Sequence, residues 1–223
     1  MKPALRRFGE GEHPVVVVDD FTGNAGSIRE IAAAMAPFPA SQGGYYPGLR
    51  RYITEADEVA YTYAVRLLEN AAPFIGGAFG FDSFDWIEAS FSLVTAAPEA
   101  LKPPQRAPHF DSTDPNYLAV LHYLADTAGT AFYRQRQTGI EQVDENNLTR
   151  FVDHARAATA TARGYIQGSD PHYEQVGLVE GAADRVVIYR GSLLHSGVIP
   201  PGTVLSADPR QGRLTANLFV LGR

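Results

Sequence analysis

The sequence predicts a mainly β domain with flanking helices, and two observations support this fold class. Apolar residues follow the helical period before residue 80 and the two-residue period of strands from residue 84 onward. The composition, 45% hydrophobic and 20% charged, supplies enough apolar side chains for a continuous core. We expect a single domain over residues 1–223, because all-β barrels and sandwiches often run to about 200–250 residues as one unit.

The first 80 residues are expected to contribute one strand and two helices that support the rest of the domain. Residues 14–18 read PVVVV, which is typical of a short buried strand. A helix is predicted after Asn24, where apolar residues recur at helical spacing: Ile28, Ile31, Ala32 and Met35. A second helix is predicted to begin at Thr54, with Asp57 completing its cap, and to end near Pro73.

The β core is predicted over residues 84–221. Its first strand alternates apolar with other residues, as a half-buried strand does: Ile87, Ala89, Phe91 and Leu93 against Trp86, Glu88, Ser90 and Ser92. Further strands are expected at residues 117–124, 130–135, 185–190 and 214–221, with a turn at Ala128-Gly129. The alanine-rich residues 146–163 are predicted to form a helical insertion between these strands.

Composition and charge exclude several classes of function. The net charge is -6 and the basic residues are scattered, so we expect no nucleic-acid partner. No run reaches the roughly 18 apolar residues that a membrane span needs, and we expect a cytoplasmic protein with no membrane partner. Because the chain has no cysteine, nitrogen and oxygen atoms are the only strong ligands that it offers a metal ion.

Three metal-ligating side chains stand in a pattern that suits one ion. His109 and Asp111 are two residues apart, so on an extended chain both point to the same side. His195 follows the apolar strand 185–190 and would supply a third ligand. Two histidines and one carboxylate leave positions open on a ferrous ion, as non-haem iron oxygenases require. The alternative is structural: a turn around residues 108–115 and an ordinary histidine after a strand.

The order of these residues along the chain resembles the 2-oxoglutarate/Fe(II)-dependent dioxygenase superfamily, and its prolyl-hydroxylase-like branch has the nearest layout. The resemblance covers roughly residues 84–221 and reads, in order, His109-x-Asp111, His122-Tyr123-Leu124, Gly129-Thr130-Ala131-Phe132, His195-Ser-Gly and Arg213-x-Thr215. Within the superfamily the chain is similar to an uncharacterised bacterial group. The resemblance implies a double-stranded β-helix (jelly roll, cupin-like) that uses Fe(II) and 2-oxoglutarate.

The resemblance also implies roles for individual residues. His109, Asp111 and His195 match the metal ligands and so the catalytic centre. Arg213 matches the basic residue that binds the distal carboxylate of 2-oxoglutarate, a task that suits the planar guanidinium fork. Tyr123 matches a tyrosine whose hydroxyl touches the same carboxylate in the prolyl-hydroxylase-like branch, and Thr215, on the same strand face as Arg213, could add a further hydroxyl donor.

The spacing between His195 and Arg213 is longer than is usual in the superfamily, which leaves Arg210 or Arg190 as alternatives for the cosubstrate. We prefer Arg213, because it begins an apolar strand where an unpaired charge is costly unless something binds it. A structural ion pair at the end of the barrel is the other interpretation of Arg213.

Candidate substrate contacts lie in two segments. The glycine-rich stretch 43–51 carries Tyr45, Tyr46 and Arg50 and could cover the mouth of the barrel, although its tyrosines could equally well pack on the barrel as part of a turn. Arg134, on a hairpin strand, has the same two interpretations. The remaining histidines are expected to have no metal role: His13, His122, His154 and His172.

The sequence therefore predicts an oxygenase that hydroxylates a small molecule or a peptide or protein side chain. Two alternatives keep the same metal ligands: a cupin-like enzyme without 2-oxoglutarate, and a β-helix protein that binds a ligand without turnover. Exposed edge strands make a homodimer a further expectation. Fold alone does not fix the substrate, because substrate contacts come from variable loops.

Overall fold

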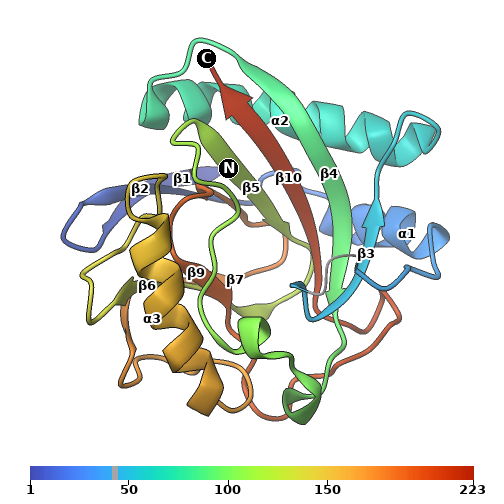
Figure 1. Cartoon of the computed structure of the whole chain (residues 1–223). Coiled ribbons are helices and arrows are strands. Elements are labelled where there is room, and N and C mark those ends of the chain that lie inside the picture. The colour runs from blue at the N-terminus through green and yellow to red at the C-terminus, as the bar shows by residue number, and fades with distance from the viewer. Residues whose placement is uncertain (42–44) are drawn as a thin grey trace.

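Two antiparallel β-sheets of unequal size face each other in the computed structural model, which describes residues 1–41 and 45–223 (Figure 1). The seven-stranded sheet has the order β1-β2-β8-β5-β10-β4-β3 and the three-stranded sheet the order β7-β6-β9. The strands of the larger sheet are β1 (Lys2–Phe8), β2 (His13–Asp19), β3 (Gly48–Tyr52), β4 (Phe84–Val94), β5 (Tyr117–Tyr123), β8 (Val186–Arg190) and β10 (Leu214–Gly222). Those of the smaller sheet are β6 (Thr127–Gln135), β7 (Tyr173–Gly181) and β9 (His195–Gly197).

Three α-helices cover the outer faces of this sandwich (Figure 1). Helices α1 (Ala25–Ala34) and α2 (Glu58–Phe79) share one apolar core with the outer face of the larger sheet. Helix α3 (Leu148–Thr161) packs against residues of the smaller sheet through Phe151 and Ala158. Two short 3-10 helices, η2 (Pro98–Ala100) and η3 (Pro103–Arg106), precede the segment that carries His109 and Asp111. A second core fills the space between the sheets, with Leu121, Phe132 and Val187 among its members.

A hydrogen-bonded network of buried side chains ties the helices to the larger sheet. The carboxylate of Asp184 accepts hydrogen bonds from Nε2 of His122 (3.0 Å), Oγ1 of Thr22 (2.5 Å) and the backbone N–H of Gly23 (2.6 Å). Because a carboxylate only accepts, Nε2 of His122 carries the proton, and its Nδ1 accepts from the Tyr63 hydroxyl (2.8 Å). Burial raises the pKa of Asp184, but the hydrogen bonds outweigh it and hold this pKa at about 2.

The predicted elements are present, with shifted boundaries. Helix α2 begins at Glu58, four residues after Thr54, and continues through Pro73 to Phe79. The prediction that the helix ends near Pro73 was therefore wrong; Ile75 and Phe79 keep its last turns packed on the sheet, which compensates for the hydrogen bond that proline removes. The predicted turn at 128–129 lies within β6. In the described part of the chain, no helix is long and apolar enough to cross a membrane.

Strand β4 departs from the simple alternation that its sequence predicts. The pairing of β4 with β10 shifts its register between Phe219 and Val220, so one extra residue is accommodated near Ile87. Trp86 therefore packs on the helix side, stacked on Tyr61, while Ile87 is 49% exposed. Ser90 and Ser92 are fully buried rather than solvated, because their face of the strand looks into the space between the two sheets.

Candidate functional site

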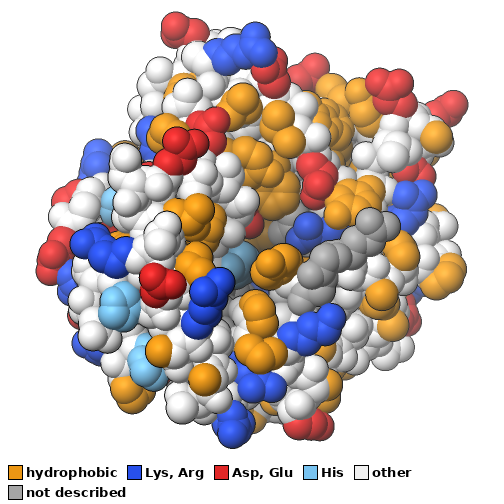
Figure 2. Space-filling model, viewed as in Figure 1, with side chains coloured by type: hydrophobic (Ala, Val, Ile, Leu, Met, Phe, Trp, Pro, Cys, Tyr) orange, Lys and Arg blue, Asp and Glu red, His pale blue; other side chains and the backbone are white. Residues whose placement is uncertain are grey.

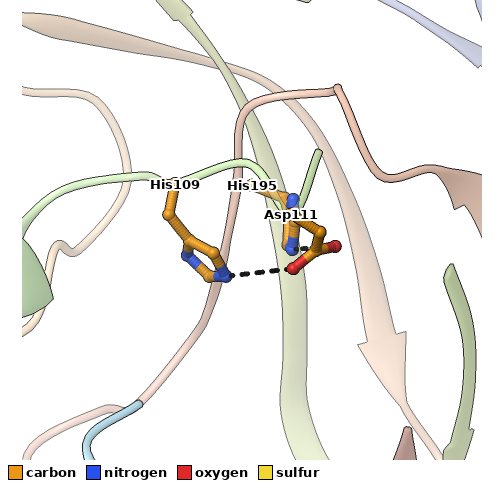
Figure 3. A group of neighbouring side chains, drawn as sticks. All are labelled: His109, Asp111 and His195. Atoms are coloured by element: carbon orange, nitrogen blue, oxygen red, sulfur yellow. Dashed lines mark ion pairs between the residues drawn. The ribbon is translucent and has the colours of Figure 1, made fainter. Parts of the chain in front are cut away.

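His109, Asp111 and His195 converge at one point between the two sheets (Figure 3). Nε2 of His109 lies 3.9 Å from Oδ1 of Asp111, and Nε2 of His195 lies 3.6 Å from Oδ2 of the same carboxylate. One ligand atom from each of the three residues lies within 4.8 Å of the other two. Among the described residues this is the only group of His, Asp and Glu side chains with such spacing, so the structure brings together the three residues that the sequence singled out.

Backbone hydrogen bonds fix the relative positions of these three residues. His109 and His195 form an antiparallel bridge in which each N–H donates to the carbonyl of the other (2.9 and 2.8 Å). The N–H of Asp111 donates to the carbonyl of Gly191 (2.6 Å), at the end of β8. A Cβ atom at Gly191 would lie 2.7 Å from the ring of Tyr117 and 3.2 Å from Cβ of Asp111, so only glycine lets the segment of Asp111 approach β8 this closely.

The protonation of the histidines suits metal binding. Nδ1 of His195 lies 2.8 Å from the carbonyl oxygen of Leu193, which can only accept, so Nδ1 carries the proton and Nε2 presents its lone pair to the centre. Partial desolvation in the cavity, and then the nearby His195 and Arg50, lower the pKa of His109, whose side chain nevertheless stays 54% exposed. Burial raises the pKa of Asp111, and His195 and Arg50 oppose that rise. The lone pair that Nε2 of His195 presents and the lowered pKa of His109 both favour the binding of a cation.

The three residues line a cavity of about 780 Å³ that opens to the surface. Figure 2 shows this hollow, with hydrophobic, histidine and charged side chains around it. Its walls come from both sheets and from α3, which contributes residues one helical turn apart: Val152, Ala155, Arg156 and Thr159. The volume falls in the range of about 300–1,000 Å³ that is common for small-molecule sites.

Arg213 reaches the same cavity at the start of β10, and its surroundings fit a carboxylate ligand. The residue is 8% exposed, and its Nη2 donates to the carbonyl of Gly129 (3.1 Å). Its Nε is buried without a partner, and it forms no salt bridge with any residue that the structure describes. The guanidinium lies against Gly197, where an added Cβ would be 3.3 Å from Nη2, and Gly197 is two residues from His195 on β9. A small dicarboxylate between Arg213 and the metal ligands would supply the missing partner.

The other residues predicted for the cosubstrate lie around Arg213. Thr215 is buried in the cavity wall, and its Oγ1 accepts a hydrogen bond from Asn217 (3.3 Å). The Tyr123 hydroxyl is 2.5 Å from Oγ1 of Thr130, which also lines the cavity, and the Arg213 guanidinium lies 6.0 Å from the Tyr123 ring centroid. Tyr123 itself is not among the lining residues, so any effect on a ligand would be exerted through its neighbours.

The two alternative arginines lie outside the cavity. Arg210 forms an exposed ion pair with Glu30 (2.6 Å) on α1. Arg190 lies over the rings of Phe79 and Phe81 and donates to a backbone carbonyl. The long segment 198–213 between β9 and β10 accounts for the unusually long spacing between His195 and Arg213.

The predicted substrate residues divide into two groups. Tyr45, Tyr46 and Arg50 line the cavity, although Gly43 and Gly44 of the same stretch lie outside the described residues. Arg134 does not line the cavity: its side chain pairs with Glu174 (2.8 Å) and with Glu10. These carboxylates match its charge, so the structure does not support Arg134 as a substrate contact.

Sequence reasoning missed several cavity residues. Tyr189 contacts His195 edge-on, with ring centroids 4.9 Å apart, and Asn217, Phe110 and Tyr165 also line the walls. Tyr189 lies in an apolar strand, β8, whose sequence indicates a position in the hydrophobic core and gives no sign of a cavity contact. The polar residue Asn217 could have been found from its inward register on β10, but that register requires the pairing of the strands.

A protein-family model matches almost the whole chain. Residues 1–220 match the model described as "Family of unknown function (DUF6445)". The chain belongs to this family. No curated protein matches it.

Solved structures share its fold at low sequence identity. HygX from Streptomyces hygroscopicus with iron bound is 14% identical, with a TM-score of 0.55 over 93% of this chain and 82% of HygX. HygX with nickel, 2-oxoglutarate and hygromycin B bound is 12% identical, with a TM-score of 0.52 over the same shares. A prolyl-4-hydroxylase from Pseudomonas putida is 15% identical, with a TM-score of 0.47 over 96% of this chain and 95% of that one. The likeness to the two HygX structures confirms the predicted double-stranded β-helix fold.

Proposed function

We propose that this protein is an Fe(II)- and 2-oxoglutarate-dependent oxygenase that hydroxylates a small molecule. One observation carries the proposal: a cluster of two histidines and one aspartate shares a cavity with a buried arginine whose Nε has no partner. The fold shared with HygX supports it, because HygX has been solved with iron and with 2-oxoglutarate.

His109, Asp111 and His195 would hold the metal ion. Two neutral imidazoles and one carboxylate leave part of the coordination shell of Fe(II) to other ligands, whereas a structural zinc site usually takes four protein ligands. The hydrogen bond from Nδ1 of His195 to Leu193 and the contact of Asp111 with Gly191 keep two of the ligands oriented. The bound ion, with 2-oxoglutarate and oxygen, supplies the oxidising chemistry that amino-acid side chains lack.

Arg213 and Thr215 would bind the distal carboxylate of 2-oxoglutarate. The guanidinium presents two parallel N–H groups to a carboxylate, and the low exposure of Arg213 strengthens such a pair. Tyr189 and Phe132 surround His195 with aromatic rings and limit the access of water to this end of the cavity.

Anaerobic titration of the apoprotein with Fe(II) and then 2-oxoglutarate tests the proposal. We expect the weak visible charge-transfer band of the metal chelate in the wild type, no band in His109→Ala, and weakened 2-oxoglutarate binding in Arg213→Gln. His154→Ala and Arg210→Gln serve as matched controls, because both side chains lie outside the cavity. Iron binding without a band at saturating 2-oxoglutarate would reject the cosubstrate and leave the cupin-like or non-catalytic alternative.

A further inference from the structure

Buried polar atoms without a partner are concentrated at one side of the cavity, partly in its lining and partly in the strand behind it. Seven buried side-chain atoms make no hydrogen bond among the described residues. Five of them belong to a group that we call the polar wall: Tyr46, Arg50 and Arg213, which line the cavity, and Ser90 and Ser92 of the neighbouring strand β4, which do not. Because each such group costs folding free energy, a cluster of them indicates a polar ligand.

The polar wall contains two separate guanidinium groups. Arg213 lies at the start of β10, close to Gly129 and Gly197 of the smaller sheet. Arg50 lies on β3, the edge strand, where it pairs with Ser92, which in turn pairs with Thr215. With neighbouring strands about 4.8 Å apart, the backbone of Arg50 is roughly 10 Å from that of Thr215. Arg50 and Arg213 therefore enter the cavity from different strands.

Arg50 has donor capacity that the protein itself does not use. The structure gives none of its N–H groups a hydrogen bond to any described residue, and its Nε is buried. Its ion pair with Glu88 is loose, at 3.7 Å, beyond hydrogen-bond distance. The ring of Tyr46 holds the guanidinium in place, with Cζ 5.0 Å from the ring centroid, and the buried Tyr46 hydroxyl faces Ser92 without a hydrogen bond of good geometry.

The cavity has room for a second molecule besides 2-oxoglutarate. The cavity of about 780 Å³ exceeds the needs of 2-oxoglutarate, which has ten non-hydrogen atoms. Across the cavity from the sheets, one face of α3 offers mostly apolar contacts, including Val152 and Ala155, with Phe110 beside them. The free volume thus has a cationic end at Arg50 and an apolar side at α3.

We propose that Arg50, with Tyr46 beside it, binds a carboxylate of the primary substrate, which is therefore a small organic acid whose apolar body lies against α3. This inference rests on the proposed function and deepens it by naming the class of substrate. Arg50 is a specificity residue in this view: it holds the acid with its body beside the metal ligands, while Arg213 holds the cosubstrate.

Binding of matched probes to the Fe(II)- and 2-oxoglutarate-loaded protein, measured anaerobically by calorimetry, tests the inference. The probes are hexanoate with hexanamide, 3-phenylpropanoate with 3-phenylpropanamide, and hexyl phosphate. The variants are Arg50→Gln and Arg50→Lys, with Arg156→Gln as the control, because Arg156 also lines the cavity but its side chain is 78% exposed. Thermal unfolding of each variant reports whether it is folded.

We expect at least one acid to bind about tenfold or more tightly than its amide in the wild type and in Arg156→Gln. Arg50→Gln should abolish this preference, and Arg50→Lys should restore part of it, because lysine keeps the charge without the planar fork. Stronger binding of hexyl phosphate than of hexanoate would overturn the carboxylate assignment. Equal binding of acids and amides, or no binding of any probe, would overturn the inference as a whole.

The 2-oxoglutarate affinity of the variants separates this inference from the proposed function. Arg50→Gln should leave that affinity within about threefold of the wild type, whereas Arg213→Gln should lower it tenfold or more. If Arg50→Gln loses 2-oxoglutarate and Arg213→Gln keeps it, Arg50 is the cosubstrate residue and the inference is wrong. If the wild type itself binds no 2-oxoglutarate, the proposed function fails, and the acid and amide probes then decide the role of Arg50 in the protein without cosubstrate.

Discussion

The protein contains two clusters of buried polar residues on opposite faces of its larger sheet, and they differ in how completely they are hydrogen-bonded. On the helix side, Asp184, His122, Tyr63 and Thr22 satisfy one another. On the cavity side, the polar wall leaves atoms of Tyr46, Arg50, Ser90, Ser92 and Arg213 without partners among the described residues.

This difference separates groups that stabilise the fold from groups that await a ligand. A satisfied buried network stabilises the folded chain and becomes costly when one member is removed. An unsatisfied group lowers stability until a ligand supplies its partner, so its removal should cost binding rather than stability. The four predictions below test this contrast, from the largest expected effect to the smallest.

Asp184→Ala should lower the free energy of unfolding by about 3–5 kcal/mol, because it leaves His122 and the N–H groups of Thr22 and Gly23 without their acceptor, at about 1–3 kcal/mol for each donor that stays unsatisfied. Urea denaturation measures the change. Asp153→Ala is the matched control, since this carboxylate is 65% exposed on α3 and should shift stability by less than about 0.5 kcal/mol. A loss below about 1 kcal/mol for Asp184→Ala would contradict a stabilising role for the network.

The free energy of unfolding should fall on acidification, because the Asp184 carboxylate becomes protonated. Its folded pKa of about 2 lies below the ordinary value of 3.8, so its contribution is fully present above pH 3.8 and is lost as the pH falls through about 2. The difference between these values corresponds to about 2 kcal/mol. The free energy of unfolding, measured between pH 6 and pH 2.5, should decline more steeply in the wild type than in Asp184→Asn. Parallel curves would mean that Asp184 has an ordinary pKa.

Gly191→Ala should weaken metal binding about tenfold, which is roughly 1.4 kcal/mol. The added Cβ would meet the Tyr117 ring at 2.7 Å and press on the segment that carries Asp111. Fe(II) affinity is measured by anaerobic competition with a chelator. In Gly77→Ala, an added Cβ meets nothing within 4 Å, so this α2 variant should keep wild-type affinity. Equal affinities in all three proteins would show that Asp111 does not depend on this close approach.

Arg213→Met should leave the apoprotein as stable as the wild type or raise its free energy of unfolding by up to about 1 kcal/mol, because it removes a buried charge that has no carboxylate partner. The same variant should bind 2-oxoglutarate at least tenfold more weakly. Urea denaturation without ligand and calorimetry with 2-oxoglutarate give the two values. A loss of stability comparable to that of Asp184→Ala would place Arg213 with the structural groups instead.

The sequence predicted those elements whose pattern reports directly on burial. Strands β2, β5, β8 and β10 carry apolar or alternating runs, and α1 and α3 show helical spacing, so each could be located before any pairing was known. Strands β1, β3, β7 and β9 were not predicted. Residues Lys2–Phe8 are exposed or half-exposed along the whole of β1, so no apolar period marks that strand. Local sequence contains no signal for an element that is held mainly by its neighbour's backbone.

The site divides in the same way. The sequence by itself supplied the three metal-binding candidates, from paired ligands two residues apart and a histidine after an apolar strand, and its resemblance to the dioxygenase superfamily supplied Arg213. Only the tertiary structure decided that Arg50 enters the cavity while Arg134 leaves it, and that Ser90 and Ser92 face inward. The physical reason is that the face of the sheet on which a side chain lies depends on the register of its strand with the neighbouring strands. That register is fixed by contacts between residues that are far apart in the sequence.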